Sequence, residues 1–192
     1  MALGGCSGAA SPAKAVTSAE HSLTIAEARA EYRLYVENST AAAKQGDMTN
    51  GLAVVADGQW AIVHAQYRAL ATSGTPVPQY SYGTPTFYVP ALSGYPQWFV
   101  VTVPVTTATG TPASSMIMAF DRSAPDELWT LNGSAVLDHP LPAIARDSDG
   151  YAINVSTKDT SLLLPPNVVG ATQAAVVDEG PTTPAAGVIA SG

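Results

Sequence analysis

Apolar and polar residues alternate most clearly within the stretch Tyr95–Val105. Every second residue of Phe99–Val105 is apolar, whereas the opposite row begins with Trp98, Val100 and Thr102 and is mixed. Because successive side chains of a strand point to opposite faces, the first row predicts a face that lies on a core. The mixed row predicts a second face that is only half covered.

Similar runs, rich in β-branched and aromatic residues and bounded by turn residues, predict further strands. They are Thr86–Val89, Ala113–Phe120, Glu127–Leu131, Pro142–Ala145 and Tyr151–Val155. Ser115–Phe120 is apolar on both faces, which predicts a central position in the sheet. The pair Asn132-Gly133 predicts a hairpin turn, and a bulge inside one long strand, Glu127–Leu137, is the competing interpretation.

Upstream of the strands the apolar residues recur at helical spacing. In the first predicted helix this stripe consists of Ile25, Ala28, Tyr32, Tyr35, Val36 and Ser39. Thr24 and Glu27 have the spacing of a capping box, and Gly46 is placed to end the helix. A second stripe runs from Leu52 to Leu70, and Gly58 is expected to divide it into a short helix and a longer one. A third, short helix is predicted for Asn167–Asp178.

These elements predict an α+β protein in which N-terminal helices pack on a curved, mostly antiparallel sheet, because a sheet that is apolar on one face needs a covering layer. The small, Pro-containing segment 1–19 has too few apolar residues to fold alone and predicts a flexible tether. Residues 20–165 form the predicted domain. Residues 166–192 are expected to form a short helix and a linker that leads to a second domain.

Composition narrows the range of partners. The net charge is −7 and only 12% of the 192 residues are charged. A nucleic-acid partner requires clustered cations, so none is expected, and binding to anionic membranes through charge is equally disfavoured. No apolar stretch has the length of a membrane span.

The single cysteine, Cys6, follows Leu3-Gly4-Gly5 and precedes a small, polar segment. This arrangement is typical of a bacterial lipobox, in which the cysteine receives a diacylglycerol group. The basic and apolar segments of a signal peptide do not precede it, so we expect the sequence to begin inside the signal. The alternative is a chance free thiol. The lipobox interpretation predicts an extracytoplasmic protein that a lipid anchors to the outer face of the cell membrane.

No catalytic or metal-binding constellation is evident. The three histidines, His21, His64 and His139, are far apart and lack metal-ligand spacing. No nucleophile elbow and no Gly-rich phosphate loop is present. Asp147–Gly150 lacks most of the ligands of a calcium loop and is interpreted as a turn. We therefore predict no cofactor, metal or catalytic residue.

Aromatic residues on or beside the predicted sheet are the best candidates for a binding site. They are Tyr80, Tyr82, Tyr88, Tyr95, Trp98 and Trp129, with His64 on the second helical stripe. A sheet that wraps a helix leaves a mouth, where Tyr and Trp side chains can line an apolar pocket. The alternative is that they pack in the core and at its rim, as aromatic residues on strands commonly do.

The order of helix, broken helix and long antiparallel sheet resembles the cystatin-like and nuclear-transport-factor-two-like cone folds. Cys6 with its tether, together with the segments Tyr88–Pro90, Tyr95–Phe99 and Leu128-Trp129, resembles an uncharacterised family of actinobacterial lipoproteins. The resemblance covers residues 20–180 and implies that a second, similar domain follows. The Gln-x-Val-x-Gly loop of cystatin inhibitors is missing, so protease inhibition is not implied.

Three functions remain open. The favoured prediction is a surface-anchored, non-enzymatic domain that binds a small molecule or a protein in the cell envelope. The first alternative is a small cone-fold enzyme, a cyclase or isomerase, with an apolar pocket and an acid/base pair that includes His64. The second is a structural module of an extracellular assembly, for which a homo-oligomer and an extended apolar contact surface are expected.

Overall fold

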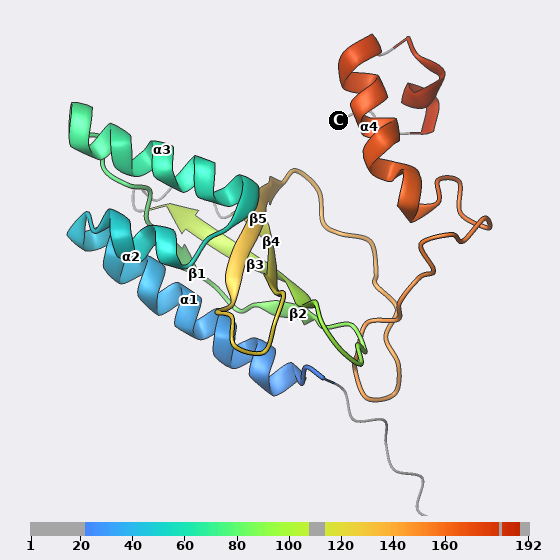
Figure 1. Cartoon of the computed structure of the whole chain (residues 1–192), viewed down its shortest axis with the longest axis horizontal. Helices are drawn as coiled ribbons and strands as arrows, with labels where there is room; N and C mark the ends of the chain where they lie inside the picture. The colour runs from blue at the N-terminus through green and yellow to red at the C-terminus, as the bar shows by residue number, and fades with distance from the viewer. Residues whose placement is uncertain (1–21, 108–113, 181, 189–192) are drawn as a thin grey trace, which may run out of the picture.

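The computed structural model describes residues 22–107, 114–180 and 182–188. The predicted tether 1–19 and its Cys6 lie outside the described residues. So do residues 108–113 and the last residues of the predicted linker. The chain is α+β, with helices packed on an open antiparallel sheet (Figure 1).

The first helix, α1 (Ile25–Gln45), has the predicted ends. The side chain of Thr24 accepts a hydrogen bond from the Glu27 N–H at 3.1 Å, and the Glu27 carboxylate accepts one from the Thr24 N–H at 2.7 Å. Gly46 ends the helix with φ at 66°, in the left-handed region that glycine tolerates best. The capping box and the C-cap are therefore confirmed.

The second stripe forms two helices, α2 (Met48–Ala53) and α3 (Asp57–Ser73), but the predicted position of the break is wrong. The break falls at residues 54–56, and Gly58 lies inside α3. The physical reason is a pairing with the sheet: the Leu131 N–H donates to the Val54 carbonyl and the Ala56 N–H donates to the Leu131 carbonyl, both at 3.0 Å. These backbone groups bond to a strand and so cannot continue a helix.

Five strands form one sheet: β1 (Tyr80–Tyr82), β2 (Thr86–Tyr88), β3 (Gln97–Thr107), β4 (Ser114–Arg122) and β5 (Thr130–Leu137). Every pairing is antiparallel, in the order β1-β3-β4-β5, and β2 also pairs with β3. The central position predicted for β4 is thus confirmed. Tyr80 and Tyr82, placed on or beside the sheet by the sequence, lie on the strand β1.

The Asn132-Gly133 pair does not form a hairpin. It lies inside β5, where Ala119 pairs with Gly133 and Phe120 pairs with Leu131, so Asn132 is the extra residue of a bulge. The competing interpretation of the sequence is therefore the correct one. The predicted strands at 142–145 and 151–155 are not formed. Single bridges join Arg146 and Pro90 to Ala152 in that part of the described chain.

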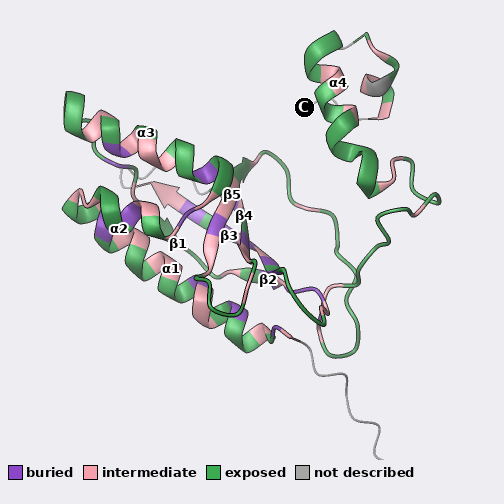
Figure 2. Ribbon diagram, viewed as in Figure 1, coloured by how far each residue is buried: buried purple, intermediate pink, exposed green. Residues whose placement is uncertain are grey.

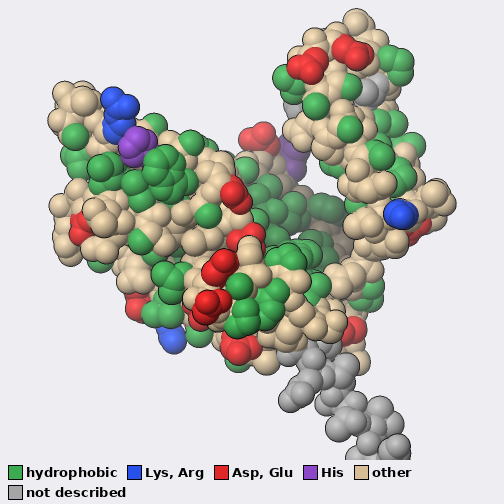
Figure 3. Space-filling view, in the orientation of Figure 1, with side chains coloured by type: hydrophobic (Ala, Val, Ile, Leu, Met, Phe, Trp, Pro, Cys, Tyr) green, Lys and Arg blue, Asp and Glu red, His purple; other side chains and the backbone are tan. Residues whose placement is uncertain are grey.

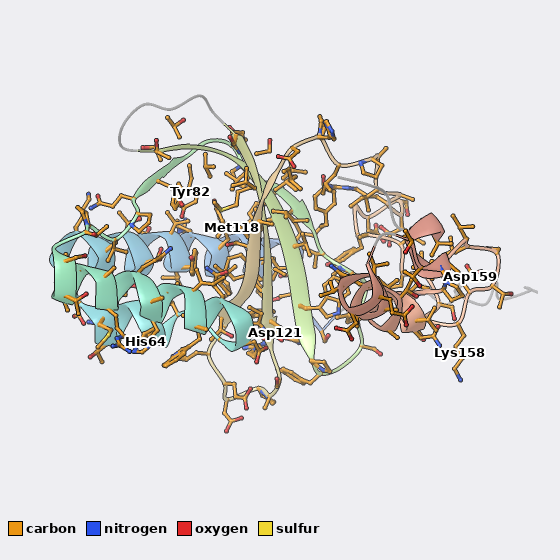
Figure 4. All side chains as sticks on the ribbon, turned by 90° about the horizontal axis from the view of Figure 1, so that it is seen from above. His64, Tyr82, Met118, Asp121, Lys158 and Asp159 are labelled. Atoms are coloured by element: carbon orange, nitrogen blue, oxygen red, sulfur yellow. The ribbon has the colours of Figure 1, made fainter. Side chains whose placement is uncertain are left out.

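The core lies between the helices and one face of the sheet. On β3, Phe99, Val101 and Val103 are fully buried, as the alternation predicts. On β4 the buried residues are Met116, Met118 and Phe120. Figure 4 shows α1 and α3 on the same side of the sheet and the C-terminal segment on the other side. Burial is concentrated in this helix-and-sheet body (Figure 2).

The C-terminal segment contains the short 3₁₀ helix η1 (Pro166–Val168), the helix α4 (Val169–Glu179) and a second 3₁₀ helix, η2 (Pro184–Val188). The predicted helix at 167–178 is thus present. It has no buried residue, and its substantial contacts are with η1 and η2.

Candidate functional site

A cavity of about 240 Å³ lies between α1, α3 and the covered face of the sheet. The stripe of α1 supplies Tyr35 and Ser39, and β1 supplies Tyr80 and Tyr82. Its remaining lining is largely apolar and comes mainly from α3, β4 and β5, with contributions from α1, from α2 and the link after it, and from residues 77–79. It includes Val63, Met116, Met118 and Val136. In Figure 4, Tyr82 and Met118 lie on the helix side of the sheet, where this cavity is found.

The polar groups of the cavity are uncharged. No Asp, Glu, His, Lys or Arg is among the described residues that line it. Burial raises the pKa of Tyr82 to about 12, with a smaller contribution from Tyr80. Burial likewise raises the pKa of Tyr35 well above its usual range. Both hydroxyl groups therefore stay protonated near neutral pH and can donate a hydrogen bond.

Gln59 is the buried amide of the cavity wall. Its Oε1 atom accepts a hydrogen bond from the Ser134 hydroxyl at 3.2 Å, which ties the start of α3 to β5. Its NH2 group makes no hydrogen bond with any residue that the structure describes. That amide and the tyrosine hydroxyls could orient a ligand in a mostly apolar space, which Thr40, Gln66 and Gln79 also line.

The helix α2 approaches α3 closely because Gly51 has no side chain. A Cβ atom at position 51 would overlap the ring of Tyr67. Gly51 and Tyr67 both line the cavity, so this contact fixes one of its walls. No local pattern in the sequence indicates this role for Gly51, because the contact joins two helices.

The seven aromatic and histidine residues proposed from the sequence are not gathered in one place. Tyr80 and Tyr82 line the cavity, and the other five do not. His64 stacks on the ring of Trp60, with ring centroids 4.8 Å apart, and Figure 4 shows it on the outer side of α3. Trp98 is 41% exposed on the uncovered face of the sheet. Tyr88 faces the Arg146 guanidinium at 5.1 Å.

Tyr95 and Trp129 meet at a second cluster, around Arg122. The guanidinium lies 5.5 Å from the Tyr95 ring centroid and 5.1 Å from that of Trp129. Arg122 also donates to Gln97 Oε1, and Gln97 Nε2 donates to the Ser22 carbonyl at 2.6 Å. This chain of contacts holds the start of α1 to the ends of β3 and β4, which indicates a structural role.

Arg122 and Gln97 are not among the residues predicted from the sequence. The signal that could have found them is Gln97 itself, an amide on the otherwise apolar row of the longest strand. A buried amide requires a hydrogen-bond partner. Arg122 is the residue directly opposite it in the register.

Neither a metal site nor a spanning helix is found in the described part of the chain. No three His, Cys, Asp or Glu residues there are grouped so that they could hold an ion. In the 147–150 turn, Asp147 Oδ1 accepts hydrogen bonds from the backbone N–H groups of Asp149 and Tyr151. None of the described helices combines the length and apolar character needed to cross a bilayer.

Comparison with known proteins places this cavity-bearing fold in a family. A family model described as "Domain of unknown function (DUF8094)" matches residues 19–192. The chain belongs to this family. The DUF8094 match includes the C-terminal segment with α4 as well as the helix-and-sheet body.

One relative of this DUF8094 chain is an "Uncharacterized lipoprotein" of Streptomyces avermitilis, 30% identical over 107 residues. The match covers 55% of this chain and 31% of that protein, so the chain spans less than a third of the relative's length. The resemblance to uncharacterised lipoproteins is therefore supported. No solved structure matches the chain, and the likeness to cystatin-like and nuclear-transport-factor-two-like folds stays a prediction.

Proposed function

We propose that the protein is a lipid-anchored, extracytoplasmic domain that binds an apolar small molecule in the cavity between α1, α3 and the sheet. The observation that carries the binding role is the uncharged lining of a preformed cavity of about 240 Å³. Ligand sites in proteins are typically apolar clefts with a few placed polar groups. Here those groups are the Tyr35 and Tyr82 hydroxyls and the Gln59 amide.

The same lining favours binding over catalysis. A cyclase or isomerase needs an acid/base pair within hydrogen-bond reach of its substrate. The described residues that line the cavity include no carboxylate, imidazole or amine. His64, the base expected in the enzyme alternative, stacks on Trp60 outside the cavity. The raised pKa of the tyrosines also makes them weak proton donors.

The cavity can be tested with a neutral, hydrophobic fluorescent probe such as N-phenylnaphthylamine. We expect saturable binding to the wild type and at least about tenfold weaker binding to Ser39→Phe, whose new ring would fill part of the cavity. Asn38→Phe, on the exposed side of the same helix, is the matched control. Equal binding by Ser39→Phe and the wild type, with both folded by circular dichroism, would contradict the proposal.

The anchor rests on Cys6 and its neighbours and on the lipoprotein relative. Full-length protein made in its own host should incorporate a labelled fatty-acid precursor, and Cys6→Ala should abolish the labelling. Ser7→Ala, which keeps the thiol, should be labelled like the wild type. Labelling that persists in Cys6→Ala would remove the anchoring part of the proposal and leave the binding part untouched.

A second candidate function is self-association through the uncovered face of the sheet. Thr102, Ile117 and Ala135 lie in one row across this face, and the next row contains Val100 and Ala119, on the same face as the exposed Trp98. Figure 3 shows hydrophobic side chains in the hollow between the helix-and-sheet body and the C-terminal segment. Two such faces can pack on each other as in a β-sandwich. A dimer by light scattering that Trp98→Ala dissociates would support this role, and a monomer at all concentrations would contradict it.

A further inference from the structure

A second hollow borders the cavity and shares one residue with it. This groove, about 590 Å³ in volume, lies between α1 and the turn that joins β1 to β2. Tyr82 lines both the groove and the cavity. The two hollows are therefore neighbouring spaces, with the Tyr82 side chain between them.

The groove differs from the cavity in charge. Arg29 and Arg33 line it, one helical turn apart on α1, and Glu37 follows one turn later. Two of the chain's five arginines thus flank one groove in a protein of net charge −7. The three charges leave this region with a local excess of one positive charge.

The two arginines are available to a ligand. Neither guanidinium makes an ion pair or a hydrogen bond with any residue that the structure describes, although Arg29 lies 5.8 Å from the centroid of the Phe87 ring. A guanidinium presents a planar set of donors that matches a carboxylate or a phosphate. Two of them beside an apolar groove suit the head of an anionic amphiphile.

A buried hydroxyl next to the groove is also unexplained. Among the described residues, Tyr32 is 6% exposed and its hydroxyl group has no hydrogen-bond partner. Leaving such a group unpaired is unfavourable, so a partner supplied by a ligand would be favoured. Tyr32 itself lines the groove, and its ring packs edge-on against the Tyr82 ring, with centroids 6.4 Å apart, so a ligand in the groove could supply the missing hydrogen-bond partner.

The size of the cavity points in the same direction. About 240 Å³ is less than the roughly 300–1,000 Å³ of typical small-molecule sites. The cavity by itself suits a slim chain or one part of a larger ligand. Together with the groove it becomes a site of ordinary size, apolar at one end and cationic at the other.

We propose that the cavity and the groove form one bipartite site for a single-chain amphiphile with an anionic head. The chain occupies the cavity, and the carboxylate or phosphate of the head binds Arg29 and Arg33, with Tyr82 at the passage between the two parts. This inference rests on the proposed function, because it assigns a chemical class to the ligand of the same cavity.

The test compares lauric acid, lauryl phosphate and lauryl alcohol, which share one chain, by isothermal titration below their micelle concentrations. We expect at least one of the anionic ligands to bind about ten- to a hundredfold more tightly than the alcohol, as charge-assisted hydrogen bonds worth about 1.5–3 kcal/mol imply. The preferred anion distinguishes a carboxylate from a phosphate head. Arg29→Gln/Arg33→Gln should remove the preference and keep the binding of the alcohol.

Arg68→Gln, an exposed arginine of α3 outside both hollows, is the matched control for charge and should behave like the wild type. Equal affinities for all three ligands would overturn the bipartite site while the apolar cavity of the proposed function stands. A preference for an anion that persists in the arginine variant would also overturn the bipartite site. If none of the three ligands binds and the neutral dye still does, the assignment of the ligand as an amphiphile is wrong and the proposed function stands. Loss of dye binding as well would overturn both.

Discussion

The two faces of the sheet are built from the same strands, but one is buried beneath helices and the other is largely exposed or half-buried. On the covered face, Phe99, Val101 and Val103 are fully buried beneath α1 and α3. On the uncovered face, Trp98 is exposed and Val100 is half-buried, although both alternate with the buried residues. Alternation therefore determines which side chains share a face. The helices determine which of the two faces becomes a core.

The covered face is itself uneven, and the candidate site lies where the cover is incomplete. Along β5 the residues of this face change from Leu131, which is 1% exposed, to Val136, which is 55% exposed. The cavity is found towards the Val136 end, between the sheet and α3. A core that is closed at one end and open at the other thus combines packing and a candidate binding site in one layer.

The largest loss of stability is expected when an aromatic ring is removed from the closed end of the core. Phe120 stacks on Phe99 at 4.9 Å and meets the rings of Tyr35 and Tyr32 edge-on. Phe120→Ala should lower the free energy of unfolding by about 3–5 kcal/mol, because it leaves a cavity in a packed core. Urea denaturation measures this loss. A loss below about 1 kcal/mol would show that the covered face is not the core.

The next effect concerns the wall of the cavity. Gly51→Ala places a methyl group on the Tyr67 ring and should cost about 1–3 kcal/mol through overpacking. Gly58→Ala is the matched control, because nothing lies within 4 Å of its added Cβ atom inside α3. That control should be neutral or stabilising by up to about 1 kcal/mol. Thermal unfolding of the two variants measures the difference, and similar melting temperatures would contradict the contact.

Alkaline pH should weaken the open end of the covered face. The folded-state pKa of Tyr82 is about 12, above the value of about 10 of an unfolded chain. The unfolded state therefore loses its proton first, so the contribution to stability is complete below about pH 10 and disappears as the pH rises towards about 12. We expect a loss of about 1–2 kcal/mol, allowing for partial exposure. In Tyr82→Phe the free energy of unfolding, measured by urea denaturation between about pH 10 and 12, should fall less steeply with pH. An unchanged slope would contradict the assignment of this effect to Tyr82.

The smallest effect is expected on the uncovered face. Trp98→Ala removes a side chain that is 41% exposed, and the free energy of unfolding should change by no more than about 0.5–1 kcal/mol. Binding of the neutral dye in the cavity should also be unchanged. A destabilisation comparable to that of Phe120→Ala would mean that the two faces are equally packed, and the comparison would fail.

Much of this architecture is accessible from the sequence because it depends on local signals. The caps of α1 at Thr24 and Gly46 and the buried row of β3 follow from spacing alone. Other features depend on contacts between distant segments. The break between α2 and α3 is fixed by hydrogen bonds to Leu131, and a window around Gly58 does not contain that information.

The candidate site is harder to predict from the sequence than the fold, because it too depends on contacts between distant segments. Tyr80 and Tyr82 are proposed for a pocket and do line the cavity, and both lie on a short strand that faces α1. Gln59 and Ser134, which line the same cavity and bond to each other, lie 75 residues apart in sequence, one on a helix and one on a strand. Trp129 and Tyr95 share the aromatic character on which the proposal relies, but they surround Arg122, whose position follows from strand register.

The backbone hydrogen bonds between Leu131 and the α2–α3 link affect how the edge of the sheet could pair with another chain. An unpaired strand edge is a template on which another chain can add, and proteins commonly cover such edges. Here the link pairs with β5 at Leu131, and on the other side of the sheet the Ala152 N–H donates to the Val89 carbonyl just after β2. The backbone groups of Leu131 and the Val89 carbonyl are therefore already bonded within the chain. A second copy of the chain could not add a strand to the sheet at these two points.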